Sequence, residues 1–194
     1  FPGIAVRPEQ IVYRYSGVRP LPHSEAGFTG RISRDHLVTE LPGDPPVLCL
    51  VGGKWTTFRA FGEQAADRAL DHLGMNRKLR TAARPIGGGA GFPLDEAGRL
   101  ALVASLAQSA DVSTSRAAHA VNHYGTRAAE ILAFCRDVGD APLAGTCYTE
   151  AELRYLTRYE HARTLSDLLQ RRTSLAITGA LSSAMIARAA ARST

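Results

Sequence analysis

The chain has 194 residues, of which 45% are hydrophobic and 21% are charged, a balance typical of one sizeable globular domain or two small ones. This composition excludes a collagen, an intrinsically disordered chain and a bundle of membrane-spanning helices. The net charge of +5 permits anionic partners, but the basic residues are spread along the chain, so no nucleic-acid-binding tract is predicted. Lysine is scarce: Lys54 and Lys78 are the two lysines among 23 basic residues.

The three cysteines, Cys49, Cys135 and Cys147, lie far apart and form no Cys-x-x-Cys pair. This spacing indicates neither a disulfide framework nor a structural zinc site, and it favours a reducing compartment. The first residues show no basic segment followed by an apolar one, so no signal peptide is predicted. The longest apolar stretch, residues 175–187, is too short to span a bilayer.

The first part of the chain is predicted to be rich in strands and turns. Segments 10–15 and 32–41 contain many β-branched, aromatic and aliphatic residues, and prolines and glycines interrupt them. The apolar run 47–51 is of the kind that is buried on both faces of a sheet. From Thr57 the spacing of apolar residues predicts a helix that stops at Gly74. The expected local order is therefore strand, Gly-Gly-Lys turn and helix.

After this helix the composition changes. Residues 75–94 resemble a connector, in which the Gly87-Gly88-Gly89 run predicts a flexible loop. The sequence that follows is rich in alanine, leucine and arginine and has few strand signals. Thr149 and Glu152 have the spacing of a capping box. The predicted helices cover residues 95–109, 113–123, 126–137, 150–170 and 173–191.

The predicted organisation is an α+β chain with two parts. A strand-rich part covers residues 1–73, a linker covers residues 74–94, and an all-helical C-terminal domain covers residues 95–194. The helical domain has apolar stripes of its own, which predict an independent core.

The segment from Gly52 to Arg59 is the most informative motif. Its paired glycines let the backbone approach a ligand closely, and the helix that follows directs free N–H groups toward that ligand. The motif therefore predicts a site for an anionic or electron-rich group. It is not a P-loop, because the first glycine of that motif is missing and Trp55 follows Lys54. The alternative is an ordinary strand-to-helix turn capped by Thr56 or Thr57.

Arg19 and Arg34 lie in strand-and-turn context and are candidate phosphate-binding residues. The fork of an arginine side chain matches phosphate oxygens in a bidentate way that lysine does not reproduce. The alternative is a solvated or ion-paired arginine, and Arg34 has Asp35 beside it.

His119 and His123 have the i, i+4 spacing with which a helix can hold a metal ion. No third ligand completes a zinc motif, so surface or capping histidines are favoured and no metal site is predicted. No arrangement of serine, histidine and aspartate typical of a hydrolase is recognisable either.

Taken together, these motifs resemble the flavin-dependent glycerol-3-phosphate dehydrogenases of the D-amino-acid-oxidase-like superfamily. The resemblance rests on Ser-Gly-Val-Arg-Pro-Leu at 16–21, Ile-Ser-Arg-Asp at 32–35 and Gly-Gly-Lys-Trp-Thr-Thr-Phe-Arg at 52–59. It continues into the second half, where the segments 123–126, 148–163 and 168–173 are similar to the helical C-terminal domain of that family. The resemblance therefore covers most of the chain.

The resemblance implies an α+β fragment, in which the end of an FAD- and substrate-binding region precedes the helical domain. It also implies that Lys54 is catalytic. The family holds the ADP part of FAD with a Gly-x-Gly-x-x-Gly motif that this chain lacks, so we expect that the chain alone binds no FAD and is inactive. The implied FAD-binding residues are Gly52, Gly53, Lys54 and Thr56, and the implied substrate-binding residues are Arg19 and Arg34.

The implied activity is oxidation of glycerol 3-phosphate to dihydroxyacetone phosphate, with electrons passed to quinone. The implied location is the cytoplasm, peripheral to the cytoplasmic face of the membrane, and a homodimer stays open. Two alternatives also stay open. One is a related glycerol-3-phosphate oxidase, and the other is a non-catalytic helical interaction module over residues 95–194.

Overall fold

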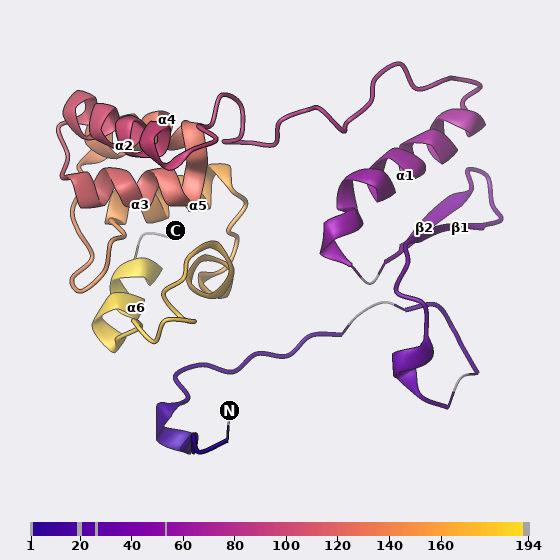
Figure 1. Cartoon of the computed structure of the whole chain (residues 1–194), viewed down its shortest axis with the longest axis horizontal. Coiled ribbons are helices and arrows are strands. Elements are labelled where there is room, and N and C mark those ends of the chain that lie inside the picture. Colours follow the sequence, from indigo (N-terminus) through magenta and orange to yellow (C-terminus); the bar gives the residue numbers. More distant parts are fainter. Residues whose placement is uncertain (1, 19–20, 26, 53, 192–194) are drawn as a thin grey trace. The chain divides into compact units, whose positions relative to one another are not determined.

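The computed structural model describes residues 2–18, 21–25, 27–52 and 54–191 (Figure 1). The chain divides into two compact units. One unit is Ser16–Arg84, and the other combines residues 1–15 with residues 85–194. Among the described residues, no helix has both the length and the apolar character that crossing a membrane requires.

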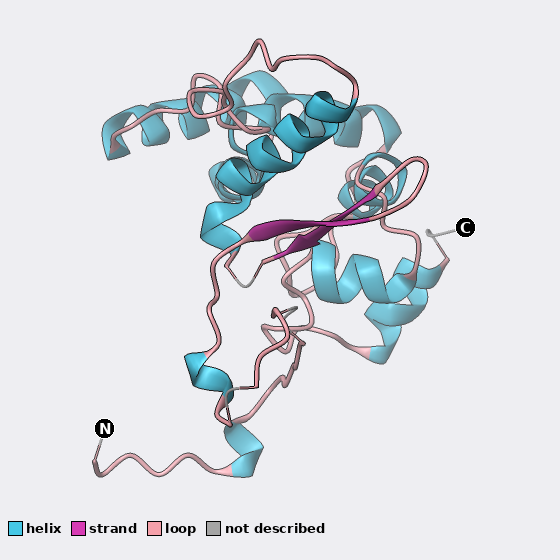
Figure 2. Cartoon of the chain, turned by 90° about the vertical axis from the view of Figure 1, so that its right-hand side faces the viewer, coloured by secondary structure: helices cyan, strands magenta, loops and turns pink. Residues whose placement is uncertain are grey.

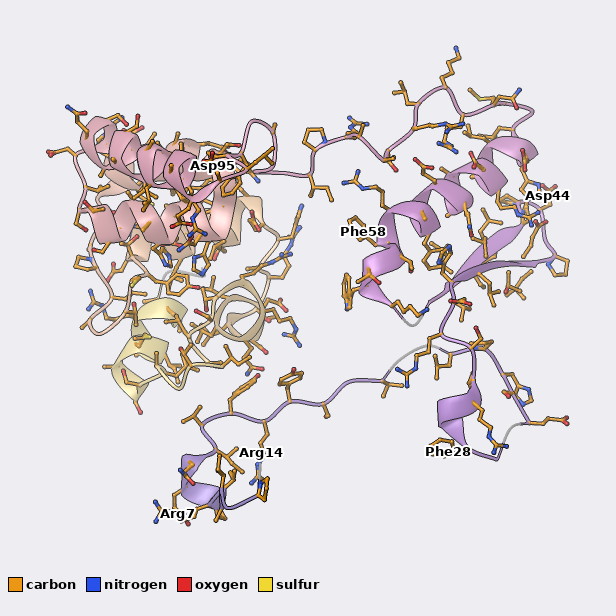
Figure 3. The ribbon with its side chains drawn as sticks, viewed as in Figure 1. Arg7, Arg14, Phe28, Asp44, Phe58 and Asp95 are labelled. Carbon is orange, nitrogen blue, oxygen red and sulfur yellow. The ribbon has the colours of Figure 1, made fainter. Side chains whose placement is uncertain are left out.

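The Ser16–Arg84 unit contains a β-hairpin and one long helix (Figure 2). Strands β1 (Leu37–Leu41) and β2 (Val47–Val51) pair antiparallel, and Leu37 lies opposite Val51. A 3-10 turn (Trp55–Thr57) leads into α1 (Phe58–His72), which contacts both strands. Figure 3 labels Asp44 in the loop between the strands and Phe58 at the start of the helix. The predicted order of strand, turn and helix is confirmed.

The end of α1 shows why the predicted stop is correct. Gly74 has a φ of +65°, a left-handed conformation that glycine adopts without a Cβ penalty. Its N–H donates to the carbonyl of Asp71, and the N–H of Met75 donates to the carbonyl of Leu70 at 2.9 Å. These two hydrogen bonds satisfy the last carbonyls of the helix.

Two strand predictions are wrong in extent. Gln10 ends a 3-10 turn (Pro8–Gln10) and residues 11–15 have no regular structure, whereas only Leu37–Leu41 of segment 32–41 is a strand. Strand β2 is not buried on both faces, since Val47 and Leu50 are 55% and 50% exposed. β-branched and aromatic residues fit the surface of a sheet, but a strand forms only where its backbone pairs with another strand. Among the described residues, segment 10–15 has no such strand partner.

The second unit is helical, as predicted, and its first three helices are confirmed to within one or two residues at each end. The chain forms α2 (Glu96–Ala110), α3 (Thr114–Tyr124), α4 (Ala128–Val138), α5 (Glu150–Tyr159), a π-helical turn (Asp167–Arg172) and α6 (Ser183–Ala190). Four of these helices begin with a side-chain oxygen that accepts a hydrogen bond from a backbone N–H three residues further on. These caps are Asp95, which Figure 3 labels, Ser113, Thr149 and Ser182.

The core of the helical unit consists of two main groups of side chains. Alanines and small aliphatic residues allow α2, α3 and α4 to approach closely, whereas larger side chains from α5, the π-helical turn and α6 fill the second group. Buried members of the two groups include Ala117, Ala120, Val121, Ala128, Leu132, Leu143, Leu153, Leu156, Leu168, Leu175 and Met185.

The last two predicted helices are longer than the observed ones. Helix α5 stops at Tyr159, and His161 has a φ of +56°, which continues no helix. Helix α6 begins only after Ser182, whose side chain accepts from the N–H of Met185 at 3.2 Å. The apolar spacing was misleading because side chains between these two helices, such as Leu168 in the π-helical turn and Leu175 in the turn after it, are also buried in the core.

The Gly87-Gly88-Gly89 run lies in a loop, as predicted, and hydrogen bonds connect this loop to the helical unit. The carbonyl of Gly88 accepts hydrogen bonds from the N–H of Thr126 at 2.9 Å and from its hydroxyl at 3.2 Å. Gly88 has a φ of +81°, and a Cβ at this position would collide with the carbonyl oxygen of Tyr124. The run therefore fits against the turn between α3 and α4.

Candidate functional site

The register of the hairpin brings two of the predicted motifs together. Since Leu37 pairs with Val51, the residues before β1 and the residues after β2 lie at the same end of the hairpin. There the Nζ of Lys54 lies 3.0 Å from the Oδ1 of Asp35. Asp35 and Lys54 are 19 residues apart in the sequence. Their contact joins the segment that contains Arg34 to the Gly-Gly-Lys turn, and we treat the two as one candidate site.

Gly52 is required here because α1 approaches the backbone closely. A Cβ on Gly52 would lie 2.9 Å from a ring carbon of Phe61 and 3.6 Å from the Cβ of His36. The rings of His36 and Phe61 are tilted against each other, with centroids 5.1 Å apart. The Nδ1 of His36 is buried and has no hydrogen-bond partner within the described part of the chain. This end of the hairpin therefore combines close packing with an unsatisfied polar atom.

The ion pair between Asp35 and Lys54 is accessible to solvent. The two side chains are 80% and 45% exposed. The hydrogen bond and the positive charge of Lys54 lower the pKa of Asp35. The backbone N–H of Asp35 also donates to the hydroxyl of Ser33 at 3.2 Å. The Lys54 ammonium is therefore accessible to solvent and is paired with the Asp35 carboxylate.

No threonine cap closes the turn between β2 and α1. Thr57 directly precedes the helix, but its side chain accepts no capping hydrogen bond. Its hydroxyl instead donates to the carbonyl of Lys54 at 3.1 Å, so the ordinary capped turn is not what the structure forms. The N–H groups at the start of the 3-10 turn, which no side chain of the described residues caps, and the nearby ammonium of Lys54 are a donor set that fits an electron-rich ring edge such as that of FAD.

The structure describes two of the other predicted site residues, Arg34 and Thr56. Arg34 is exposed and directly precedes Asp35, whose ion pair among the described residues is with Lys54 rather than with this arginine. Thr56 is exposed in the 3-10 turn. Arg19 and Gly53 lie outside the described residues.

A second polar cluster, which sequence reasoning missed, lies in the helical unit. The side chain of Glu152 is fully buried, and it accepts hydrogen bonds from Arg116 at 2.6 Å, His119 at 2.9 Å and the hydroxyl of Tyr124 at 2.6 Å. The first two donors have the i, i+3 spacing on α3, which places them on one face of that helix. This spacing was the signal that could have predicted a shared partner.

The two histidines of α3 therefore have a different role from the one predicted. His119 is buried rather than on the surface, and the described residues contain no group of three or more side chains suited to a metal ion. His123 donates from Nδ1 to the carbonyl of His119 at 2.9 Å, and its Nε2 lies 3.1 Å from the hydroxyl of Tyr148. Both rings belong to an internal hydrogen-bond network.

Glu152 also shows how the predicted capping box differs from the observed cap. Its backbone N–H donates to the hydroxyl of Thr149 at 3.1 Å, as predicted. Its carboxylate instead turns toward α3. The buried cluster joins α3 to α5 with donors and acceptors from the protein itself, so it is a structural feature rather than a ligand site.

Comparisons with known proteins agree with the motifs. The family model of the C-terminal domain of alpha-glycerophosphate oxidase matches residues 79–193. The chain is 28% identical to a glycerol-3-phosphate dehydrogenase of Synechocystis over 91% of this chain and 32% of that protein. It is 30% identical to the mitochondrial glycerol-3-phosphate dehydrogenase of Mus musculus over 89% of this chain and 24% of that protein.

A further relative is the aerobic glycerol-3-phosphate dehydrogenase of Escherichia coli, which is 32% identical over 85% of this chain and 33% of that protein. The chain thus spans about a third or less of the length of these curated relatives. Because the family model matches more than half of its residues, the chain belongs to the family of the C-terminal domain of alpha-glycerophosphate oxidase.

Proposed function

We propose that this chain forms the C-terminal part of an FAD-dependent dehydrogenase that oxidises glycerol 3-phosphate to dihydroxyacetone phosphate. The observation that carries the proposal is the hairpin register, which joins the segment of Arg34 to the turn of Gly52 and Lys54. The names of the relatives support the same substrate. The resemblance of the motifs supports FAD as the cofactor.

In this proposal the turn after β2 binds the flavin. The proposed FAD-binding residues are Gly52, Gly53, Lys54 and Thr56. FAD supplies the hydride-accepting chemistry when it is bound. The uncapped N–H groups at the start of the helix and the ammonium of Lys54 then stabilise negative charge that develops nearby, which makes Lys54 the proposed catalytic residue. Gly52 leaves room for the ring of Phe61, which packs against this turn from α1.

Arg19 and Arg34 bind the phosphate of the substrate in this proposal. Each guanidinium offers a planar fork of N–H donors that matches two phosphate oxygens. Holding the phosphate orients the carbon atom that is oxidised, so binding energy from a remote group is used for geometry at the reacting centre.

The electron acceptor and the cellular context are also proposals. The resemblance supports quinone as the acceptor and a cytoplasmic protein that associates peripherally with the cytoplasmic face of the membrane. The matched family carries the name of an oxidase, so oxygen is the second candidate acceptor. Hydrogen peroxide release during turnover without quinone would identify the oxidase, whereas turnover that requires quinone would identify the dehydrogenase.

The phosphate contacts are tested by Arg19→Ala and Arg34→Ala in the complete protein that carries this chain. Each substitution should lower kcat/KM for glycerol 3-phosphate by about one to three orders of magnitude, because a desolvated charge pair loses one partner. The rate with glycerol, which has no phosphate, should change little. Lysine at either position should rescue only in part, because the bidentate fork is lost.

Arg99→Ala is the matched control, since this exposed arginine pairs with Glu96 on α2, far from the site in sequence. It should leave both substrates unaffected. Equal losses on glycerol 3-phosphate and glycerol in the Arg34 variant would show that this arginine supports the fold or the flavin instead.

A further inference from the structure

The ion pair at the open end of the hairpin suggests a further role. Asp35 lies two residues before β1, and Lys54 lies three residues after β2. We propose that Asp35 is a positioning residue of the site, whose carboxylate holds the Lys54 ammonium where the reaction needs it. This inference rests on the proposed function, in which Lys54 acts beside the flavin.

Contacts other than the ion pair hold the backbone of both segments in place. The pairing of Leu37 with Val51 sets the spacing of the two segments across the hairpin. The N–H of Asp35 is bonded to the Ser33 hydroxyl, and the carbonyl of Lys54 accepts from the Thr57 hydroxyl. The carboxylate therefore projects from a backbone that its own hydrogen bonds orient.

A lysine at this position needs such a partner. Its four-carbon stem is flexible, and its ammonium has no fixed direction of approach. With a side chain that is 45% exposed, Lys54 is not confined by close packing of its head group. The 3.0 Å contact with Asp35 selects one rotamer from many. Small displacements of a catalytic group are costly, since about 1 Å can change a rate by about a hundredfold.

The hairpin also carries a matched control pair. Glu40 on β1 lies 3.0 Å from the Nε2 of His72 at the end of α1, and both side chains are 41% exposed. This pair has the same separation and is also accessible to solvent, but it involves neither Lys54 nor the turn after β2. A general effect of removing a carboxylate from the hairpin would therefore appear equally in Glu40→Gln.

The first experiment measures the contact itself in the 194-residue chain. Reductive methylation with a carbon-13 label marks its two lysines and keeps their charge. We expect Asp35→Asn to shift the methyl signal of Lys54 and to leave that of Lys78 in place, whereas Glu40→Gln leaves both in place. An unchanged Lys54 signal in Asp35→Asn would overturn the inference without using any flavin.

The second experiment measures the rate at which glycerol 3-phosphate reduces the flavin of the complete protein. We expect Asp35→Asn to lower this rate by about tenfold to a hundredfold, with substrate affinity unchanged because Arg19 and Arg34, and not Asp35, hold the phosphate in the proposed function. Asp35→Glu should retain most of the rate. Adding Asp35→Asn to Lys54→Met should cause no further loss, and Glu40→Gln should match the wild type.

The two proposals fail in different ways. If Lys54→Met reduces the flavin as fast as the wild type, the proposed role of Lys54 is wrong. If Lys54→Met is slow but Asp35→Asn is not, only the positioning role of Asp35 is wrong. A further loss in the double variant would also overturn the inference, because Asp35 would then act through another group.

Discussion

The carboxylate of Glu152 illustrates how a single buried charge is stabilised. Burial by itself would raise the pKa of Glu152, but the hydrogen bond from His119 and the positive charge of Arg116 outweigh it, so this pKa lies below its ordinary value of 4.5. Because the folded carboxylate holds its proton less tightly than the unfolded one, the cluster stabilises the fold above about pH 4.5. This stabilisation disappears as the pH falls through the lowered folded pKa.

We therefore predict that Glu152→Gln lowers the free energy of unfolding at pH 7 by about 3–5 kcal/mol, because Arg116 then loses a buried partner. Urea unfolding of the 194-residue chain measures this loss. The difference from the wild type should shrink as the pH falls below 4.5. Glu96→Gln, which breaks an exposed pair with Arg99, should cause little change. A loss in Glu152→Gln no larger than in this control would contradict the prediction.

At the scale of single residues, sequence patterns predicted local features, such as helix caps, better than contacts between residues far apart in the chain. The spacing of Thr149 and Glu152 correctly predicted the cap of α5, and the spacing of His119 and His123 correctly placed both on one helix. The carboxylate of Glu152 and the ring of His119 nevertheless meet across 33 residues. The spacing of Arg116 and His119 indicates that the two side chains can share a partner, but a local pattern does not show that this partner is Glu152.

At the scale of elements, the connection into α2 depends on a close contact between two glycines. Gly88 and Gly125 both have positive φ values, and a Cβ on either would collide with backbone atoms of the other turn. The carbonyl of Gly88 also accepts both hydrogen bonds of Thr126 described above. The turn between α3 and α4 is thus held against the chain that enters α2.

We predict that Gly88→Ala lowers the free energy of unfolding by about 1–3 kcal/mol more than Gly91→Ala does, because only the first places a methyl group against backbone. Gly91 has a φ of +67°, and a Cβ there would meet no atom within 4 Å, so its substitution carries the conformational cost alone. Thermal unfolding of the two variants measures the difference. Equal losses would mean that the contact with the α3–α4 turn is not tight.

Two of the helices that sequence periodicity predicted well, α2 and α3, begin with a side-chain cap. Asp95 and Ser113 begin α2 and α3 close to the predicted positions. The predicted extent of α5 was wrong after Tyr159, because apolar residues continue at helical spacing although the backbone turns at His161. Periodicity reports which side chains are buried, and a well-packed loop buries side chains too.

At the scale of the whole molecule, the two units differ in what they bury. The described residues of Ser16–Arg84 include none that is buried, whereas the helical unit contains the apolar core. We therefore predict that a polypeptide of residues 85–194 folds alone, with helical circular dichroism and a cooperative thermal transition. A polypeptide of residues 16–84 should show no cooperative transition. A non-cooperative helical polypeptide would contradict this division.

The fold class and the proposed site motifs were within reach of the sequence, but the environment of the hairpin was not. The run Val47–Val51 correctly predicted a strand, and its composition predicted burial on both faces. In this structure α1 contacts the hairpin, yet Val47 and Leu50 are half-exposed. An apolar run shows that a strand can be buried on both faces. Whether it is buried depends on the other helices and strands that cover those faces, and the run itself does not specify them.

The hairpin register also limits how the length of this chain can vary. A residue added to the loop 42–46 leaves the pairing of β1 with β2 intact, so Asp35 still faces Lys54. A residue added within β2 shifts every later position by one place and turns its side chains to the opposite face. Among natural variants of this protein, insertions and deletions should therefore gather in the loop and be absent from the strands, even where individual residues differ freely.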